Sequence, residues 1–451
     1  MSRLMISISG IRGVIGEGLE PHIIMELAQA FGTLCNKGPV VLGRDSRVSG
    51  EMLHNAAVAG LLSVGNTVID LGIATTPTTQ MATENLNAAG GLILTASHNP
   101  IMWNGLKMLT SDGLFLDAEQ GEKVLKIWRE KAFAIRTWDE IGTVRSYKNA
   151  AHEHIETVLA LPYINVSQIR ARKFKVVADC INGAGAVIVP KLLEALGCES
   201  MIINGTPDGR FSRTPEPLPE NLGEIGEAIQ QYGADFGIVV DPDSDRLALV
   251  SESGEPMGEE FTLALAVDFI LSQKKGPVAT NVSTSLVIDD IAEQHGCKVV
   301  RTRVGEINVA KRMHEIDAVI GGEGNGGVIL PDVHLGRDAI VGIAITLQKL
   351  AETGHKLGEL GNSFPQYSMV KRKIDLPADS DPAATIAALT ERYKDEETDM
   401  TDGLKIIRPK SWVQVRASNT EPIIRIMSEA PTREEAEKLA DELMQATEEA
   451  S

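Results

Sequence analysis

Cysteine is scarce in this 451-residue chain, which contains only Cys35, Cys180, Cys198 and Cys297. These cysteines lie far apart and lack Cys-x-x-Cys spacing, which excludes a zinc site and a disulfide framework and is typical of a reduced cytosol. Residues 1–13 lack the apolar core of a signal peptide, and no stretch approaches the ~20 apolar residues of a membrane span. We therefore expect a cytoplasmic protein that has no membrane partner.

Positive charge is also in short supply. Lysine and arginine number 43 against 62 aspartates and glutamates, so the formal net charge is -19. A surface this acidic repels phosphate backbones, and we expect no nucleic-acid partner. An anionic substrate would need a few locally placed cations. Hydrophobic residues at 43% and charged residues at 23% are typical of a globular protein.

The order of apolar and amphipathic segments predicts an α/β protein. The first strands are expected at residues 39–43, 67–72 and 91–94, with helices near 21–35 and 50–64. Strands and helices that alternate in this way indicate an α/β layer architecture. The pattern restarts after residue 175 and again after residue 277. The segment from about residue 369 differs and predicts a small α+β module, which ends in an amphipathic helix behind a capping box at residues 432–435.

The hexapeptide Thr-Ala-Ser97-His98-Asn-Pro follows an expected buried strand. Asn-Pro stops the strand and favours a turn, so Ser97 and His98 should lie at a strand end. A hydroxyl beside an imidazole is a candidate nucleophile or phosphate carrier, although a capped polar turn explains the residues equally well. Lys107 follows closely enough to fold back towards Ser97, and Arg12 lies on a glycine turn. Each could contact an anion or be an ordinary surface cation.

Asp241, Asp243 and Asp245 occupy alternate positions after another expected strand, so an extended backbone points their carboxylates to one side. Three crowded negative charges repel one another unless a cation lies between them, and oxygen ligands suit Mg²⁺. A calcium-binding EF-hand is the competing reading. Arg246 stands where that loop needs glycine, and residues 247–250 predict a strand instead of a helix. A polar turn without a metal is the remaining alternative.

Two further loops offer polar groups for a ligand. One combines two guanidinium groups, two hydroxyls and an amide, which suit a phosphate dianion. These groups belong to Arg416, Ser418, Asn419, Thr420 and Arg425. A capped β-turn would explain the hydroxyls but not both arginines. The other loop is rich in glycine and carries Glu323 and Asn325, which could bond the hydroxyls of a sugar.

Taken in order, these loops resemble the signature loops of the α-D-phosphohexomutases. The matching motifs are Thr-Ala-Ser97-His-Asn-Pro, Asp241-x-Asp243-x-Asp245-Arg246, Gly-Glu323-x-Asn325-Gly, Arg416-x-Ser-Asn-Thr-Glu-Pro and, near the start, Ser-Gly-Ile-Arg12-Gly. The resemblance spans nearly the whole chain. It implies three similar α/β domains with mixed sheets plus a C-terminal α+β domain around a central cleft. We place these domains at residues 1–152, 153–255, 256–368 and 369–451.

The resemblance also implies a reaction. Ser97 would be a phosphoserine, and Asp241, Asp243 and Asp245 would hold Mg²⁺ together with a phosphate oxygen on Ser97. The enzyme would interconvert hexose 6-phosphate and hexose 1-phosphate through a bisphosphate that turns over in the cleft. Charge neutralisation is implied for Arg12, Lys107 and Arg246, and a second phosphate clamp for the loop at residues 416–420. Either Lys107 or His98 would deprotonate the accepting hydroxyl, and the protein would be a monomer or a homodimer.

Departures from the family pattern bear on the substrate. Many bacterial relatives read Gly-Glu-x-Ser-Gly-His, whereas this chain has Asn325 in place of the serine and Gly327 in place of the histidine. Glu306 stands where several glucose and mannose enzymes have histidine. A carboxylate near the sugar could pair with an ammonium group, so we expect glucosamine 6-phosphate, with mannose and glucose phosphates as the alternative. A phosphomonoesterase and a catalytically silent sugar-phosphate sensor are the competing functional classes.

Overall fold

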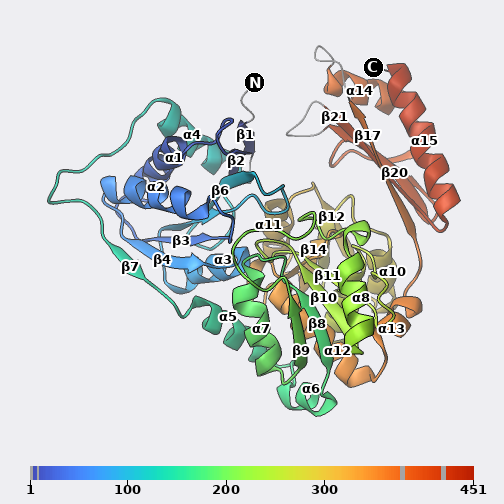
Figure 1. Cartoon of the computed structure of the whole chain (residues 1–451). Helices are drawn as coiled ribbons and strands as arrows, with labels where there is room; N and C mark the ends of the chain where they lie inside the picture. Colours follow the sequence, from blue (N-terminus) through green and yellow to red (C-terminus); the bar gives the residue numbers. More distant parts are fainter. Residues whose placement is uncertain (1–3, 8–9, 376–380, 418–422, 451) are drawn as a thin grey trace.

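A computed structural model describes residues 4–7, 10–375, 381–417 and 423–450, which form four units, each built on its own sheet (Figure 1). The first unit (blue) and the C-terminal unit (red) lie on opposite sides of the view, with the second and third units between and below them. The predicted fold class, α/β units with mixed sheets followed by an α+β unit, is confirmed. None of the described helices combines the length and the apolar character needed to cross a membrane.

The first unit has a seven-stranded mixed sheet in the order β1-β2-β6-β5-β3-β4-β7. Its strands are β1 (Leu4–Ser7), β2 (Gly10–Val14), β3 (Val40–Arg44), β4 (Val68–Ile73), β5 (Gly90–Leu94), β6 (Trp103–Leu109) and β7 (Val144–Ser146). Its helices are α1 (Pro21–Leu34), α2 (Gly50–Ser63), α3 (Thr76–Asn85) and α4 (Ala118–Arg129). β5 is parallel to β3 and antiparallel to β6, so the end of β5 and the strand β6 lie side by side.

The second unit has a four-stranded sheet in the order β11-β10-β8-β9. Its strands are β8 (Lys175–Asp179), β9 (Glu199–Ile203), β10 (Phe236–Val240) and β11 (Leu247–Val250). Its helices are α5 (Ala150–Leu159), α6 (Val166–Arg172), α7 (Gly185–Ala195), the 3₁₀ turn η1 (Pro219–Asn221) and α8 (Gly223–Tyr232). β10 and β11 form an antiparallel hairpin, and the predicted metal-binding aspartates lie on its connecting loop.

The third unit has a five-stranded mixed sheet in the order β13-β12-β14-β15-β16. Its strands are β12 (Val278–Asn281), β13 (Val299–Thr302), β14 (Ile320–Glu323), β15 (Gly327–Leu330) and β16 (His334–Arg337). Its helices are α9 (Phe261–Gln273), α10 (Val287–Gln294), α11 (Glu306–Glu315), α12 (Ala339–Thr353) and α13 (Leu357–Ser363). The predicted sugar loop is the tight turn between the antiparallel strands β14 and β15.

The C-terminal unit has an antiparallel five-stranded sheet in the order β17-β21-β20-β19-β18. Its strands are β17 (Ser368–Asp375), β18 (Glu397–Asp399), β19 (Leu404–Arg408), β20 (Ser411–Ala417) and β21 (Ile423–Ala430). Its helices are α14 (Pro382–Arg392) and α15 (Arg433–Ala450). The predicted capping box is confirmed: the Glu435 amide donates to Thr432 Oγ1, and the Thr432 amide donates to Glu435 Oε2.

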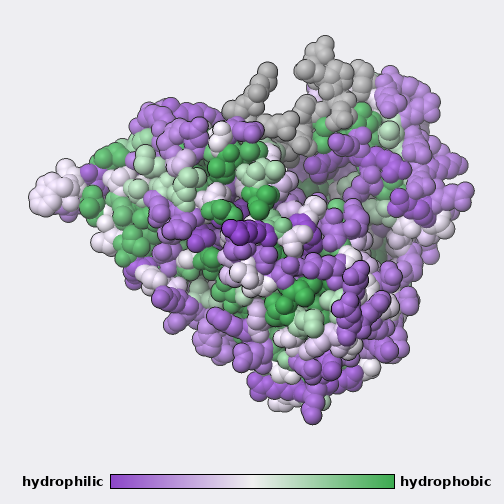
Figure 2. All heavy atoms as spheres, in the orientation of Figure 1, coloured by the Kyte–Doolittle hydropathy of each residue, from purple (hydrophilic) through white to green (hydrophobic). Residues whose placement is uncertain are grey.

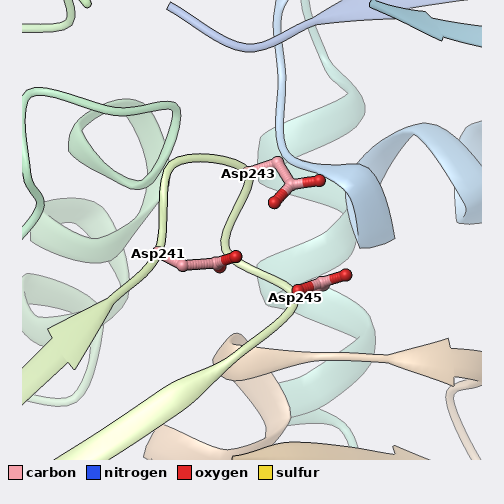
Figure 3. A group of neighbouring side chains, drawn as sticks. All are labelled: Asp241, Asp243 and Asp245. Atoms are coloured by element: carbon pink, nitrogen blue, oxygen red, sulfur yellow. The ribbon is translucent and has the colours of Figure 1, made fainter. Parts of the chain in front are cut away.

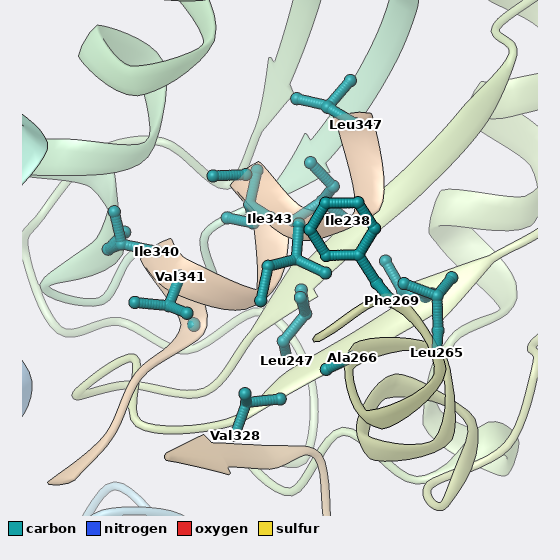
Figure 4. Close-up of a cluster of buried hydrophobic side chains, with 14 of the residues drawn as sticks. Ile238, Leu247, Leu265, Ala266, Phe269, Val328, Ile340, Val341, Ile343 and Leu347 are labelled. Carbon is teal, nitrogen blue, oxygen red and sulfur yellow. The ribbon is translucent and has the colours of Figure 1, made fainter. Parts of the chain in front are cut away.

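The second and third units share one continuous hydrophobic core (Figure 4). Ile238 and Leu247 from the second sheet pack with Phe269 of α9, Ile343 of α12 and Val328 of the third sheet. The largest core clusters of the first and the C-terminal units are separate. Because protein cores are close-packed, a shared core fixes the loops of the second and third units relative to each other.

Asp338 begins α12 and joins the third unit to the second. Its Oδ1 accepts from the amides of Ile340 and Val341, while Oδ2 lies 2.7 Å from His154 Nε2 and 3.2 Å from His334 Nε2. Burial alone would raise the pKa of Asp338, but the charge and hydrogen bond of His154, with the hydrogen bond of His334, lower it below its usual range. The buried carboxylate therefore stabilises the folded protein.

We expect Asp338→Asn to lower the free energy of unfolding by about 3 kcal/mol near pH 5, because it removes the charged partner of two buried imidazoles. A lowered pKa stabilises the fold fully above the unfolded value of about 4, and this stabilisation is lost as the pH falls through the folded value. Urea unfolding should therefore show a smaller difference between the two proteins near pH 3.5 than near pH 5. The exposed Asp112→Asn is the control. An equal difference at both pH values would contradict the assignment.

Candidate active site

Ser97 lies just after β5 in a conformation that few non-glycine residues adopt. Its φ is +49°, and the residue is 2% exposed. Ser97 Oγ is 3.3 Å from Asp241 Oδ2 and 3.2 Å from His98 Nδ1, and the Ser97 amide donates to Thr95 Oγ1. The left-handed backbone thus places the hydroxyl between the imidazole and a buried carboxylate. Backbone strain of this kind is concentrated at functional sites.

Arg47 holds this loop in place, a role that the sequence did not indicate. Its buried guanidinium pairs with Asp45 at 3.0 Å and donates to four backbone carbonyl oxygens at 2.6 to 2.9 Å. These oxygens belong to Ser97, Asn99, Pro100 and Trp103. The sequence around Arg47 reads as a polar turn, and nothing in it signals that the turn is buried beneath the Ser97 loop.

The three predicted metal-binding aspartates are brought together on the loop between β10 and β11 (Figure 3). Asp241, Asp243 and Asp245 are 0% exposed, and one carboxylate oxygen of each lies within 4.8 Å of the others. Burial, followed by the charges of Asp245 and Asp243, raises the pKa of Asp241 well above its usual range. The side chains leave the loop towards the same side (Figure 3).

The donor set fits a divalent cation. Asp243 Oδ2 accepts from Lys107 Nζ at 2.9 Å and from Thr76 Oγ1 at 2.7 Å. Two further carboxylate oxygens of the triad, Asp243 Oδ1 and Asp245 Oδ1, are buried and accept no hydrogen bond from any described residue. Burial of an unpaired carboxylate oxygen is costly, and a bound cation would remove that cost. The triad is therefore able to bind a metal ion.

Two arginines near Ser97 keep unused donors. Arg12 donates to Asn99 through Nη1, and Arg246 donates to Glu216 through Nη1. In the described part of the chain, neither buried Nε has a hydrogen-bond acceptor. Burial, together with the nearby charges of Arg246 and Arg12, lowers the pKa of His98 well below its usual range, which favours the neutral imidazole. An anion on Ser97 would meet donors that are already in place.

Arg337, the last residue of β16, was not predicted and connects the sugar loop to the aspartates. Its Nη2 donates to Asp245 Oδ2 at 2.5 Å, its Nη1 to Glu323 Oε2 at 2.6 Å and its Nε to Glu306 Oε2 at 3.1 Å. Burial raises the pKa of Glu306 against the opposing charge of Arg337. The expected free carboxylate at Glu306 is thus a buried group whose charge is compensated inside the protein, where it also accepts from Gln80.

The turn between β14 and β15 explains one departure from the family pattern. A Cβ at Gly327 would lie 2.2 Å from Cδ of Arg337, so any side chain at this position would displace the arginine. Asn325, on the same turn, has a buried Oδ1 that accepts no hydrogen bond from the residues the structure describes. The turn therefore presents an unused acceptor beside Arg337.

The predicted phosphate clamp is described in part. Arg416 on β20 and Arg425 on β21 are direct partners in the antiparallel register. Burial and the charge of Arg425 lower the pKa of Arg416, opposed by the charges of Asp402 and of Glu323 in the third unit. Arg416 Nε is buried without an acceptor among the described residues. Ser418, Asn419 and Thr420 lie outside the described residues.

Figure 2 shows a hollow between the C-terminal unit and the rest of the molecule, bordered by both hydrophilic and hydrophobic residues in this view. The first three units meet directly, through the contacts of Lys107 with Asp243 and of Arg337 with Asp245. The charge of Glu323 acts on Arg416 across the interface with the C-terminal unit. Loops from all four units therefore face one region.

Comparison with known proteins identifies this arrangement. Descriptions of the phosphoglucomutase/phosphomannomutase family match in chain order: alpha/beta/alpha domain I over residues 4–134, domain II over 152–254, domain III over 258–367 and the C-terminal domain over 370–446. The fold and site are those of a metal-dependent phosphohexomutase, which is an isomerase. The chain belongs to the phosphoglucomutase/phosphomannomutase family.

The similarity extends over the whole length of individual relatives. A phosphoglucomutase/phosphomannomutase of Thermococcus kodakarensis is 42% identical, over 95% of this chain and 94% of its own. A protein of Methanopyrus kandleri named "probable phosphoglucosamine mutase" is 38% identical, over 97% and 96%. The crystal structure of a family member from Burkholderia thailandensis superposes with a TM-score of 0.87 at 26% identity, over 99% and 98%. The predicted family membership is confirmed.

We expect Arg47→Met to lower the free energy of unfolding by about 4 kcal/mol, because Asp45 would remain as a buried, unpaired carboxylate. Mutase activity should fall as well, since four carbonyl groups of the Ser97 loop lose their donor. Urea unfolding and hexose phosphate turnover measure the two effects. Arg145→Met, at an exposed arginine of β7, is the matched control and should change stability by less than about 0.5 kcal/mol. Wild-type stability in Arg47→Met would contradict the assigned role.

Proposed function

We propose that the protein interconverts hexose 6-phosphate and hexose 1-phosphate through a phosphoserine at Ser97. The observation that carries this proposal is the position of Ser97 Oγ, 3.3 Å from Asp241 within the buried triad. A second observation supports a mutase over a phosphomonoesterase. In the described part of the chain, buried arginine donors without a hydrogen-bond acceptor occur beside Ser97, at Arg12 and Arg246, and again on the C-terminal unit, at Arg416. A bisphosphate needs two such anion sites, whereas hydrolysis of a monoester needs one.

In the proposed reaction the bond between phosphorus and Ser97 Oγ breaks as a bond forms between phosphorus and a sugar oxygen. The proton of that sugar hydroxyl passes to Lys107 or His98, both of which lie at the triad or at Ser97. The bisphosphate then turns over and returns its other phosphoryl group to Ser97 by the reverse steps. Each transfer conserves phosphate, so the enzyme needs no net phosphate donor once Ser97 is phosphorylated.

Positioning and charge neutralisation account for most of such a phosphoryl transfer. Asp241, Asp243 and Asp245, with a phosphate oxygen on Ser97, would hold Mg²⁺, which supplies charge neutralisation at the phosphoryl oxygens when bound. Arg12 and Arg246 donate to the phosphoryl group on Ser97. Arg416, with the remainder of its loop, would hold the phosphate at the far end of the substrate.

For the substrate we propose glucosamine 6-phosphate. The sequence argument rested on Glu306, and its pairing with Arg337 weakens that argument. Support remains in the sugar loop's surroundings, because Glu306 and Glu323 place two carboxylates there that pair with the single guanidinium of Arg337. The name of the M. kandleri relative also supports an amino sugar. The name of the T. kodakarensis relative supports glucose and mannose phosphates as the alternative.

Ser97→Ala should lose mutase activity completely, because it removes the hydroxyl that lies 3.3 Å from Asp241 Oδ2. Intact-mass and peptide analysis of wild-type protein incubated with a hexose bisphosphate should find one phosphate, on Ser97, and none in the variant. Ser111→Ala, at an exposed serine of the same unit, is the control and should keep both the phosphate and the activity. A fully active Ser97→Ala variant would refute the mechanism.

Side-by-side assays with glucosamine, mannose and glucose 6-phosphates test the substrate. We expect kcat/KM to be highest for glucosamine 6-phosphate by about tenfold, roughly the gain from one charge-assisted hydrogen bond. The preference should weaken as the pH rises through the pKa of the sugar ammonium, because the neutral amine lacks the charge. If glucosamine 6-phosphate proves the poorest of the three substrates, the amino-sugar assignment is wrong while the mutase assignment stands.

A further inference from the structure

Arg337 is the point at which the metal-binding loop and the sugar loop touch. Each of its three nitrogens donates to a different carboxylate: Nη2 to Asp245, Nη1 to Glu323 and Nε to Glu306. The residue is 8% exposed, and Asp245 is fully buried. One guanidinium therefore compensates a predicted metal ligand and a predicted sugar ligand at once.

The geometry requires the planar fork of arginine. A lysine ammonium is a compact point charge and cannot reach three carboxylates that lie on different sides of the fork. Arg337 occupies Oδ2 of Asp245, which leaves the buried Oδ1 without a hydrogen bond from any described residue, 4.0 Å from Arg246 Nε. Arg337 also shares Glu323 with two donors of the third unit, the Asn281 side chain and the Gly305 amide, so the orientation of Glu323 is fixed.

Gly327 supplies the space for this arrangement. The φ of Gly327 is outside the left-handed region, so the backbone there does not require glycine. A Cβ at this position would lie 2.2 Å from Arg337 Cδ and 2.9 Å from Arg337 Cγ. The contact that forbids a side chain is thus with Arg337 itself, and the two positions form one structural unit.

We propose that Arg337 is a positioning residue that couples sugar recognition to cation binding. It holds Glu323 in the orientation that receives the sugar hydroxyls, and its positive charge beside Asp245 weakens the binding of a divalent cation to the triad. Gly327 contributes to the same role, because the absence of a side chain there leaves the space in which the guanidinium contacts all three carboxylates. The proposal rests on the proposed function for its sugar and cation ligands.

The proposal predicts that removal of Arg337 strengthens cation binding and weakens binding of the sugar phosphate. These opposite changes in affinity separate this role from a merely structural one. Removal of a unit charge a few ångströms from the triad should strengthen cation binding at least about tenfold. Loss of the donor to Glu323 should lower kcat/KM for the hexose phosphate by roughly thirtyfold, mainly through KM. General loosening of the site would weaken both kinds of binding together.

The experiment compares Arg337→Met, Arg337→Lys and wild type. Calorimetric titration with Mg²⁺ in the absence of any sugar phosphate gives the cation Kd, and steady-state assays give KM and kcat. Arg337→Met should bind Mg²⁺ more tightly and have a higher KM. Arg337→Lys should keep the wild-type Kd within about twofold, since it retains the charge, and should still have a raised KM. Weaker Mg²⁺ binding in Arg337→Met, or an unchanged KM in both variants, overturns the proposal.

Gly327→Ala alone keeps the test informative if Arg337→Met does not fold, and a double-mutant cycle extends the test where Arg337→Met folds. Gly327→Ala alone should raise KM, and in the Arg337→Met background it should add little, because the group it displaces is already gone. Gly121→Ala is the matched control, since a Cβ at Gly121 meets no atom within 4 Å. Additive effects of the two substitutions would overturn the proposal. The cation titrations use no sugar phosphate, so their outcome is independent of whether the proposed mutase reaction is correct.

Discussion

The burial of several carboxylates at the junction of the units is the constraint on which the rest of the site depends. Asp241, Asp243 and Asp245 are removed from water, and uncompensated charges in such a place cost several kcal/mol each. Each of the first three units contributes a cation to this cluster: Lys107 comes from the first, Arg246 from the second and Arg337 from the third. The electrostatic requirement of one loop therefore holds three units in register, and their alignment is also what assembles the site.

The sequence predicted the elements whose signals are local. Strand ends followed by polar or glycine-rich loops located Ser97, the aspartates and the sugar loop, and the capping box located α15. The sequence did not indicate Arg47 or Arg337. Each is a single charged residue without a repeating pattern, and most of their partners lie far away in the chain, as Asp245 does from Arg337. Such roles are defined by tertiary contacts, which is also why the burial of Glu306 against Arg337 was not foreseen.

The interface between the C-terminal unit and the third unit differs from the interface between the second and third units. Its core is a separate cluster, and several of its contacts are polar: Lys405 Nζ donates to the Val282 carbonyl at 2.6 Å, and Ser283 Oγ donates to Gln414 Oε1 at 2.7 Å. Interfaces of this polar kind permit relative domain motion, whereas the continuous core of the other pair does not. In the proposed reaction the bisphosphate must turn over, and a phosphate clamp on a separately packed unit suits that requirement.

The acidity of the whole chain and the basic character of the site are compatible because charges act over different ranges in the two places. Repulsion between the surface and an anion is screened within a Debye length of about 8 Å at physiological ionic strength. The donors of Arg12, Arg246 and Arg416 are buried and act at contact distance, where screening is weak. A small phosphate ester that enters the hollow would therefore meet donors that have no acceptor among the described residues, while a long polyanion that cannot enter would meet the acidic exterior.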